Sequence, residues 1–260
     1  MTRQVLQNKP LVEAIFEIHW DVQSREGEGK ADPFYTILIG RVYERVQDKY
    51  PFHEQLPSAN IPVEMMEMMG RVVQHRFRAA EDSWPLVQLG PGVATLNDTV
   101  GYNWDNNFRF NISGLSTTLF DAHPQTKDLR IQKLILRYIN AVDFDYESEN
   151  VFHFLRDMMR INIDINEDFF VNTGISSMPD LLDLRFAFPS VAPEGKLQVR
   201  FAKGDRDEKS ALIWETVFTT DRPAISQSAE GVIQWADQAH DLIRNWFFKT
   251  IAGELHKRFE

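Results

Sequence analysis

The sequence predicts an α+β fold in which an antiparallel sheet is covered on one face by helices. Three observations predict it. Residues 11–20 alternate apolar and mostly polar side chains, the period-two pattern of a half-buried strand. Two groups of short strand-like segments, within 61–96 and 181–219, are divided by turn residues, as in antiparallel meanders. From about residue 228 onward, apolar side chains recur at i, i+3, i+4 and i+7, which predicts a long amphipathic helix.

The first half of the chain continues with a helix, a meander and a second helix. Asp32 and Pro33 form a helix-start signal, and the apolar spacing runs to about residue 49. Gly90-Pro91-Gly92 predicts a hairpin turn. The expected strands are residues 61–66, 71–79, 85–89 and 93–96. A helix with weaker propensity is predicted over 102–120.

The second half opens with a long alternating segment, 129–144, which we expect to lie centrally in the sheet. A short helix over 150–160 precedes the second meander. The expected strands there are residues 181–188, 196–202 and 211–219. In the closing helix we expect Trp235, Ala239, Leu242 and Trp246 to be buried against the sheet.

This element order indicates two structurally similar halves, each an antiparallel sheet with helices on one face. The two halves share no sequence identity that would prove a duplication, and no low-complexity linker separates them. We therefore expect one compact unit over 1–260, with a subdivision into 1–148 and 149–260 as the alternative.

Composition limits the classes of function. The chain has no cysteine, which rules out disulfides, a thiolate zinc site and a cysteine nucleophile, and favours a reducing compartment. The first residues lack the apolar run of a signal peptide, and no run is long enough to cross a bilayer, so we expect a cytoplasmic protein without membrane contact. A net charge of −10 opposes binding to nucleic acid.

Motifs for catalysis and cofactor binding are missing from the sequence. The turn at Gly90-Pro91-Gly92 lacks the lysine and the strand-to-helix context of a phosphate loop. The 7 histidines are scattered without metal-ligand spacing, and no serine lies in a nucleophile elbow. We therefore expect no catalytic residue, no metal and no cofactor.

Charged side chains on strand faces form the main candidate ligand-binding set. Successive side chains of a strand point to opposite faces of the sheet, and each of these residues is an odd number of positions from the core residues of its own strand. They are therefore expected to share the side of the sheet that faces away from the core. The set is Glu13, Glu17, His19, Arg137, Arg185 and Arg200, with Arg71 as an additional member. Arginine could grip phosphate oxygens and glutamate a divalent metal, whereas cross-strand ion pairs on a solvated sheet are the alternative.

The C-terminal helix supplies the candidate interaction residues His240, Trp246 and Phe248. His240 lies near Asp237 in the sequence, and we expect it on the polar, solvated side of the helix. One helix face cannot hold all three rings of Trp246-Phe247-Phe248, so another element or a second subunit is expected to cover one of them.

Four segments resemble an uncharacterised, sporadically distributed bacterial family of similar length. They are residues 9–18 (KPLVEAIFEI), 86–90 (LVQLG), 136–140 (LRYIN) and 235–244 (WADQAHDLIR). They follow the family's order across nearly the whole chain. The resemblance implies one structural unit and brings no known activity, ligand or catalytic residue.

Together these observations predict a cytoplasmic binding or protein-interaction protein. They favour a non-enzyme over an enzyme. We expect it to bind a protein partner or to form a homodimer. A place in a bacterial defence or toxin–antitoxin locus is a speculation that no residue supports. The alternative is a metal-dependent phosphohydrolase, or a nucleotide- or polyphosphate-binding enzyme, that uses the charged sheet face.

Overall fold

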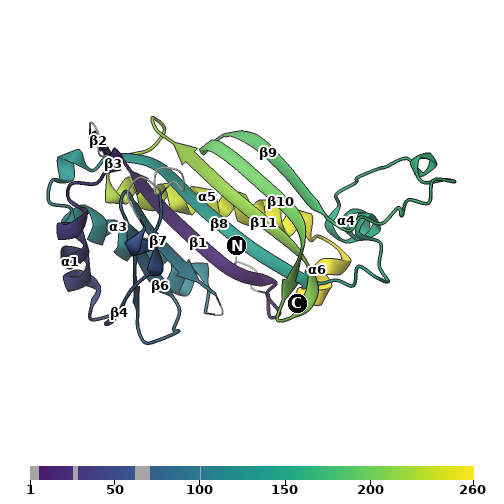
Figure 1. The fold of residues 1–260 in the computed structure, drawn as a ribbon, viewed down its shortest axis with the longest axis horizontal. Helices are drawn as coiled ribbons and strands as arrows, with labels where there is room; N and C mark the ends of the chain where they lie inside the picture. Colours follow the sequence, from purple (N-terminus) through teal and green to yellow (C-terminus); the bar gives the residue numbers. More distant parts are fainter. Residues whose placement is uncertain (1–5, 26–28, 62–70, 100) are drawn as a thin grey trace.

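The computed structural model describes residues 6–25, 29–61, 71–99 and 101–260. Nine strands form one antiparallel sheet in the order β4-β5-β6-β7-β1-β8-β11-β10-β9, and β2 pairs with β3 separately. Helices pack against this sheet (Figure 1). The predicted α+β class is confirmed, and so is the central place of the long strand, β8, beside β1.

The element bounds agree with most of the sequence predictions. The strands are β1 (Leu11–Trp20), β2 (Gln23–Arg25), β3 (Gly29–Ala31), β4 (Phe52–Gln55), β5 (His75–Arg78), β6 (Leu86–Gly90), β7 (Val93–Asp98), β8 (Ile131–Asp143), β9 (Asp183–Val191), β10 (Glu194–Arg206) and β11 (Lys209–Asp221). The helices are α1 (Tyr35–Val46), α3 (Arg109–Ala122), α4 (Val151–Met159), α5 (Ala229–Thr250) and α6 (Glu254–Phe259), with short turns η1 (Pro57–Asn60), η2 (Trp104–Phe108), η3 (Thr126–Asp128) and η4 (Glu167–Phe169). The expected strand 61–66 lies almost wholly outside the described residues.

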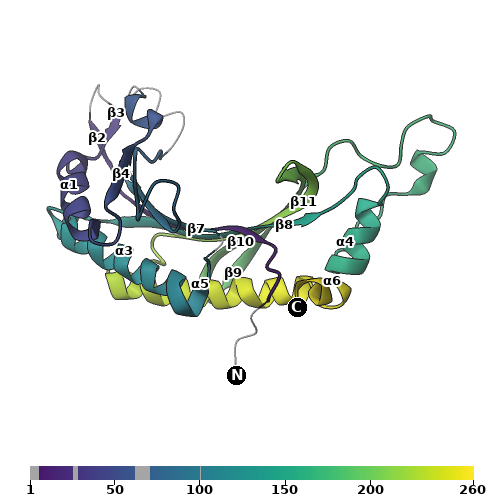
Figure 2. The same ribbon diagram turned by 90° about the horizontal axis from the view of Figure 1, so that it is seen from below.

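The sheet has one covered face and one open face. On β1, Ala14, Phe16 and Ile18 are fully buried, whereas Glu13 and Glu17, on the other face, are only partly buried. Figure 2 shows α3 and α5 running beneath the sheet, which curves so that its open face lies on the inside of the bend. The period-two alternation thus divides β1 between the hydrophobic core and a polar concave surface.

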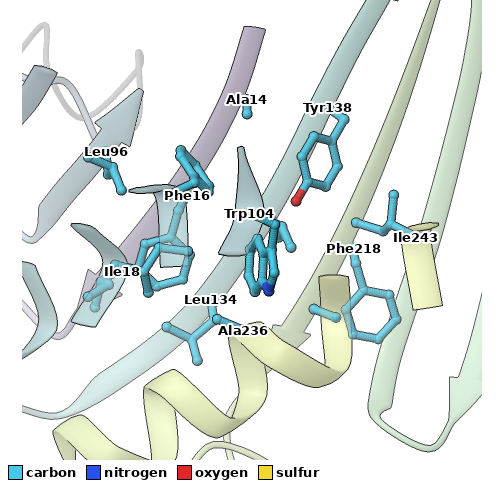
Figure 3. Packing of buried hydrophobic residues seen from close by; sticks show 14 of the residues in the cluster. Ala14, Phe16, Ile18, Leu96, Trp104, Leu134, Tyr138, Phe218, Ala236 and Ile243 are labelled. Carbon is cyan, nitrogen blue, oxygen red and sulfur yellow. The ribbon is translucent and has the colours of Figure 1, made fainter. Parts of the chain in front are cut away.

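Helix α5 completes the core. Ser228 caps its N-terminus by accepting a hydrogen bond from the Gly231 amide at 3.1 Å. Trp235 packs against Phe16 and Phe218, and its Nε1 donates to the Thr220 hydroxyl at 2.7 Å. These contacts join the helix to β1 and β11. Figure 3 shows Phe16, Phe218 and Ala236 of the same hydrophobic cluster.

The strand order has an internal symmetry. β1 and β8 lie side by side at the centre, with β7 beside the first and β11 beside the second, then β6 and β10, then β5 and β9. In chain order, α1 and α3 correspond to α4 and α5. In this correspondence β8 is the counterpart of β1, and the subdivision into 1–148 and 149–260 stays a prediction.

The C-terminal helix differs from the prediction in two ways. It is interrupted after Thr250: Gly253 has a φ of +125°, which an L side chain rarely adopts, and α6 begins at Glu254. Trp246 is 37% exposed, so the prediction that it is buried was wrong, and Leu242 is only partly buried, while Trp235 and Ala239 are buried as expected. The buried arc is shifted because α5 packs against α3 as well as against the sheet.

Strand β4 was missed by the sequence analysis. Its four residues, Phe52–Gln55, are mostly exposed at the sheet edge and carry no apolar alternation. No helix among the described residues is both long enough and apolar enough to cross a membrane.

Candidate functional site

The register places the charged candidates on one face, as parity predicts. Arg137 on β8 lies opposite Ile15 of β1, which shares the face of Glu13 and Glu17. Further along, Glu215 of β11 pairs with Arg200 of β10, and Arg200 pairs with Arg185 of β9. His19 is on the same face of β1, whereas Arg71 lies outside any strand.

These residues are spread across the open face and do not form one compact site. Four strand steps separate β1 from β9, which is about 19 Å along the sheet at the usual spacing of about 4.8 Å. At the β9 edge, Asp183 accepts bidentate hydrogen bonds from Arg185 (3.0 and 2.8 Å) and from Arg200 (2.9 and 3.1 Å). Hydrogen bonds from Arg185 and Arg200 hold the pKa of the Asp183 carboxyl well below its usual range.

The group on the central strands is also internally paired. Arg137 Nε lies 3.3 Å from Glu215 Oε1, and Asn97 donates to Glu13 at 2.8 Å. A His19 ring nitrogen lies 2.7 Å from Glu17 Oε2. Burial raises the pKa of Glu17, but the hydrogen bond to His19 and the nearby positive charges outweigh it, so the pKa lies below its ordinary value of 4.5.

The open face is therefore lined with ion pairs and hydrogen bonds, some between neighbouring strands and some, such as Glu17 with His19, within one strand. Within the described ranges, no group of three or more His, Asp or Glu side chains could hold a metal ion. The arrangement matches the cross-strand pairing that was the alternative to a ligand site.

A cavity of about 150 Å³ lies on the covered face, where α5 and η2 approach β8 and β11. We call it the inner cavity. Its lining is Leu6, Lys9, Pro10, Leu11, Tyr102, Asn103, Trp104, Asp105, Tyr138, Asn140, Thr216, His240, Ile243, Arg244, Phe247 and Phe248. Of the charged residues named as candidates from the strands, none is in this lining.

His240 is part of the inner cavity, which corrects the expectation of a solvated position. It is 6% exposed, and its ring stacks on Trp104 with centroids 3.8 Å apart and planes 3° from parallel. Its Nδ1 lies 2.9 Å from the Tyr138 hydroxyl, and the Tyr102 hydroxyl donates to Tyr138 at 3.0 Å. In Figure 3 the phenol of Tyr138 points toward the indole of Trp104. This chain of rings forms one wall of the cavity.

Two further polar side chains line the inner cavity. Asn140 and Thr216 are each 3% exposed and project from the covered face of β8 and β11. Within the described part of the chain, neither side chain has a hydrogen-bond partner. Buried polar groups are nearly always paired with protein, water or ligand, so this pair marks a place where something polar binds.

The solvent exposure of the lining residues increases from the inner end of the cavity to its rim. Asn140, Thr216 and Ile243 form a buried inner end, whereas Lys9 and Asp105 are exposed at the rim. Lys9 Nζ donates to the Tyr102 carbonyl oxygen at 2.8 Å, and the Arg244 guanidinium lies 5.0 Å from the Phe248 ring centroid. The cavity is thus apolar along its walls, polar at its inner end and charged at its mouth.

The three consecutive rings of α5 are covered in part by this chain. Phe247 stacks with Trp214 at 6.4 Å, Phe248 meets His256 at 6.0 Å, and Trp246 meets Phe188 of β9 at 5.5 Å. Trp246 also borders a second cavity of about 280 Å³ beside the β9 edge. Phe248 is therefore an inner-cavity residue, and Trp246 lies at an exposed apolar edge.

The sequence contained one signal for the inner cavity. His240 is four residues after Ala236 and three before Ile243, so it belongs to the apolar stripe of the helix. Asn140 likewise has the parity of the buried Leu136 and Tyr138. A polar residue at a position that the periodicity assigns to the core, such as His240 or Asn140, indicates a buried polar site.

Comparisons with known proteins add little. No protein-family model and no curated protein sequence matches the chain. Among solved structures, the crystal structure of the di-domain ARO/CYC BexL from the BE-7585A biosynthetic pathway is 11% identical, and the match covers 93% of this chain and 99% of that one. The TM-score is 0.21, too low to establish a shared fold.

Proposed function

We propose that this chain is a non-catalytic binding protein that holds a small organic molecule in the inner cavity. The observation that supports the proposal is the pair Asn140 and Thr216, buried at the inner end of an apolar cavity without a hydrogen-bond partner among the described residues. Both side chains line the cavity and have no partner of their own among the described residues, so a ligand that reaches the inner end can hydrogen-bond to both of them.

The surrounding walls fit this role. Ile243, Phe247 and Leu11 supply apolar contact area, and Trp104 is fixed against His240. Ligand sites are typically mostly apolar, with a few polar groups that set orientation. In this proposal His240 orients the Tyr138 hydroxyl and carries out no chemical step.

The alternative, a phosphohydrolase or nucleotide-binding enzyme on the open face, has less support. Its arginines already lie beside carboxylates: Arg200 and Arg185 donate hydrogen bonds to Asp183, and Arg137 forms an ion pair with Glu215 at 3.3 Å in which its Nε makes no hydrogen bond. A polyphosphate would have to displace these carboxylates, and the net charge of −10 opposes its approach.

A thermal-shift screen with two variants separates the two functions. The panel contains single-ring organic molecules, nucleotides, inorganic polyphosphate and divalent ions. A ligand at a hundred times its Kd stabilises the folded state by about 2.7 kcal/mol, which raises the Tm by about 5–10 °C for a chain of this size.

Asn140→Leu removes a polar group of the inner cavity, and Arg137→Gln removes a charge of the open face. An inner-cavity ligand should lose its effect in Asn140→Leu and keep it in Arg137→Gln. The reverse pattern with a nucleotide or polyphosphate would establish the alternative. A flat response of the wild-type chain to every organic molecule would count against the proposed function.

A further inference from the structure

We propose that the ligand of the inner cavity is a single-ring aromatic carboxylic acid with a hydroxyl or carbonyl group at the far end of the ring from the carboxylate. This inference rests on the proposed function and names the ligand class. In the proposed orientation the hydroxyl or carbonyl lies at the buried end, and the carboxylate lies at the mouth.

The size of the cavity limits the ligand to one ring. Its volume is about 150 Å³, and an apolar protein cavity of about that volume accommodates benzene. Substituents can extend toward the exposed rim, where Lys9 is open to solvent. A fused multi-ring molecule would require core side chains to move apart, and close-packed protein interiors resist such displacement.

The walls favour an aromatic ring over an aliphatic chain. Trp104, Tyr138, Phe247 and Phe248 all contribute to the lining. Flat rings pack on one another in offset or edge-to-face geometry with about 0.5–1.5 kcal/mol beyond their area burial. Four aromatic side chains around one small cavity therefore select a flat partner.

The inner end selects an oxygen that can hydrogen-bond to both an amide and a hydroxyl. Asn140 on β8 pairs with Trp214 of β11, and Thr216 is two residues beyond Trp214. The two side chains are thus diagonal neighbours on adjacent strands, with Cβ atoms within roughly 8 Å. A single oxygen between them can bond to both, and a phenolic hydroxyl supplies one acceptor and one donor.

The mouth selects an anion. Lys9 and Arg244 carry positive charge there, and Asp105 is the negative charge in the lining. These three side chains leave the mouth with two positive charges against one negative charge, in a chain whose net charge is −10. A carboxylate placed between them gains charge-assisted hydrogen bonds that a neutral group lacks.

Calorimetric titration with matched ligands tests the inference on the full chain. The probes are 4-hydroxybenzoate, its neutral amide 4-hydroxybenzamide, and benzoate. We expect 4-hydroxybenzoate to bind roughly tenfold more tightly than either of the others, because each lacks one of the two polar interactions. Arg244→Gln should abolish the preference for the acid over the amide, whereas Lys209→Gln, at an exposed lysine away from the cavity, should leave it unchanged.

The outcomes distinguish the two proposals. If the amide binds as tightly as the acid, or if only neutral single-ring molecules bind, the carboxylate assignment is wrong and the proposed function stands. If neither the acids nor the neutral molecules bind, both proposals are wrong. The comparison of acid and amide on the wild-type chain decides the question even if a variant fails to fold.

Discussion

Two threonines on one strand give the most direct test of the inner cavity. Thr216 and Thr220 both project from the covered face of β11 and are 3% and 1% exposed. The Thr220 hydroxyl donates to the Glu194 carbonyl oxygen at 2.6 Å and accepts from Trp235 Nε1 at 2.7 Å. Thr216 has no such partner among the described residues. The same replacement by valine, nearly equal in shape, should therefore have opposite effects.

The magnitudes follow from the hydrogen bonds. Thr220→Val leaves the Glu194 carbonyl and the Trp235 indole without partners, and we expect it to lower the free energy of unfolding by about 2–4 kcal/mol. Thr216→Val removes a buried hydroxyl that the described protein does not satisfy. We expect it to change the free energy of unfolding of the free protein by between zero and an increase of about 1 kcal/mol.

Equilibrium unfolding in urea measures both values, and equal m-values for the two variants and the wild type would show that the denatured states are comparable. A loss of more than about 1 kcal/mol in Thr216→Val would falsify the argument, because it would mean that the Thr216 hydroxyl is satisfied within the protein. Asn140 would then be left as one polar side chain of the pair at the inner end without a partner among the described residues.

Other predictions concern the core, the helix break, the open face and assembly. Trp235→Ala should cost about 3–5 kcal/mol in denaturant melts, and a loss below about 1 kcal/mol would contradict its place between β1 and β11. Gly253→Ala should lower stability by about 1–3 kcal/mol in the same assay because an L side chain is strained at a φ of +125°; an unchanged midpoint would contradict this. Because the pKa of Glu17 is lowered in the folded state, its contribution to stability is full above its ordinary value of 4.5 and lost as the pH falls below that value. Glu17→Gln should therefore be less stable than wild type at pH 7 and converge with it in unfolding experiments near pH 3; a constant difference would refute the assignment. A homodimer stays a prediction from the exposed apolar edge around Trp246, and light scattering that gives a strictly monomeric mass at tens of micromolar would remove it.

Local periodicity predicted much of the fold. A strand alternates its faces at every residue, so the charged side chains of β1, β8, β9 and β10 could be assigned to one face before their neighbours were known. The same pattern predicted that Trp235 and Ala239 are buried, and the hairpin at Gly90-Pro91-Gly92. It failed at β4, where an exposed edge strand has no buried face to impose an alternation.

The inner cavity needed the tertiary structure. Residues 102–104, 138–140, 216 and 240–248 come from distant parts of the chain, and no spacing in the sequence relates them. The sequence by itself determined the class of fold, the face to which each strand residue belongs and the long closing helix, because these depend on contacts within one element. Only the tertiary structure decided that His240 stacks on Trp104, that the buried arc of α5 turns away from Trp246, and that the ion pairs of the open face are spread across the sheet. Those features depend on which elements become neighbours, and that is set by packing the whole core.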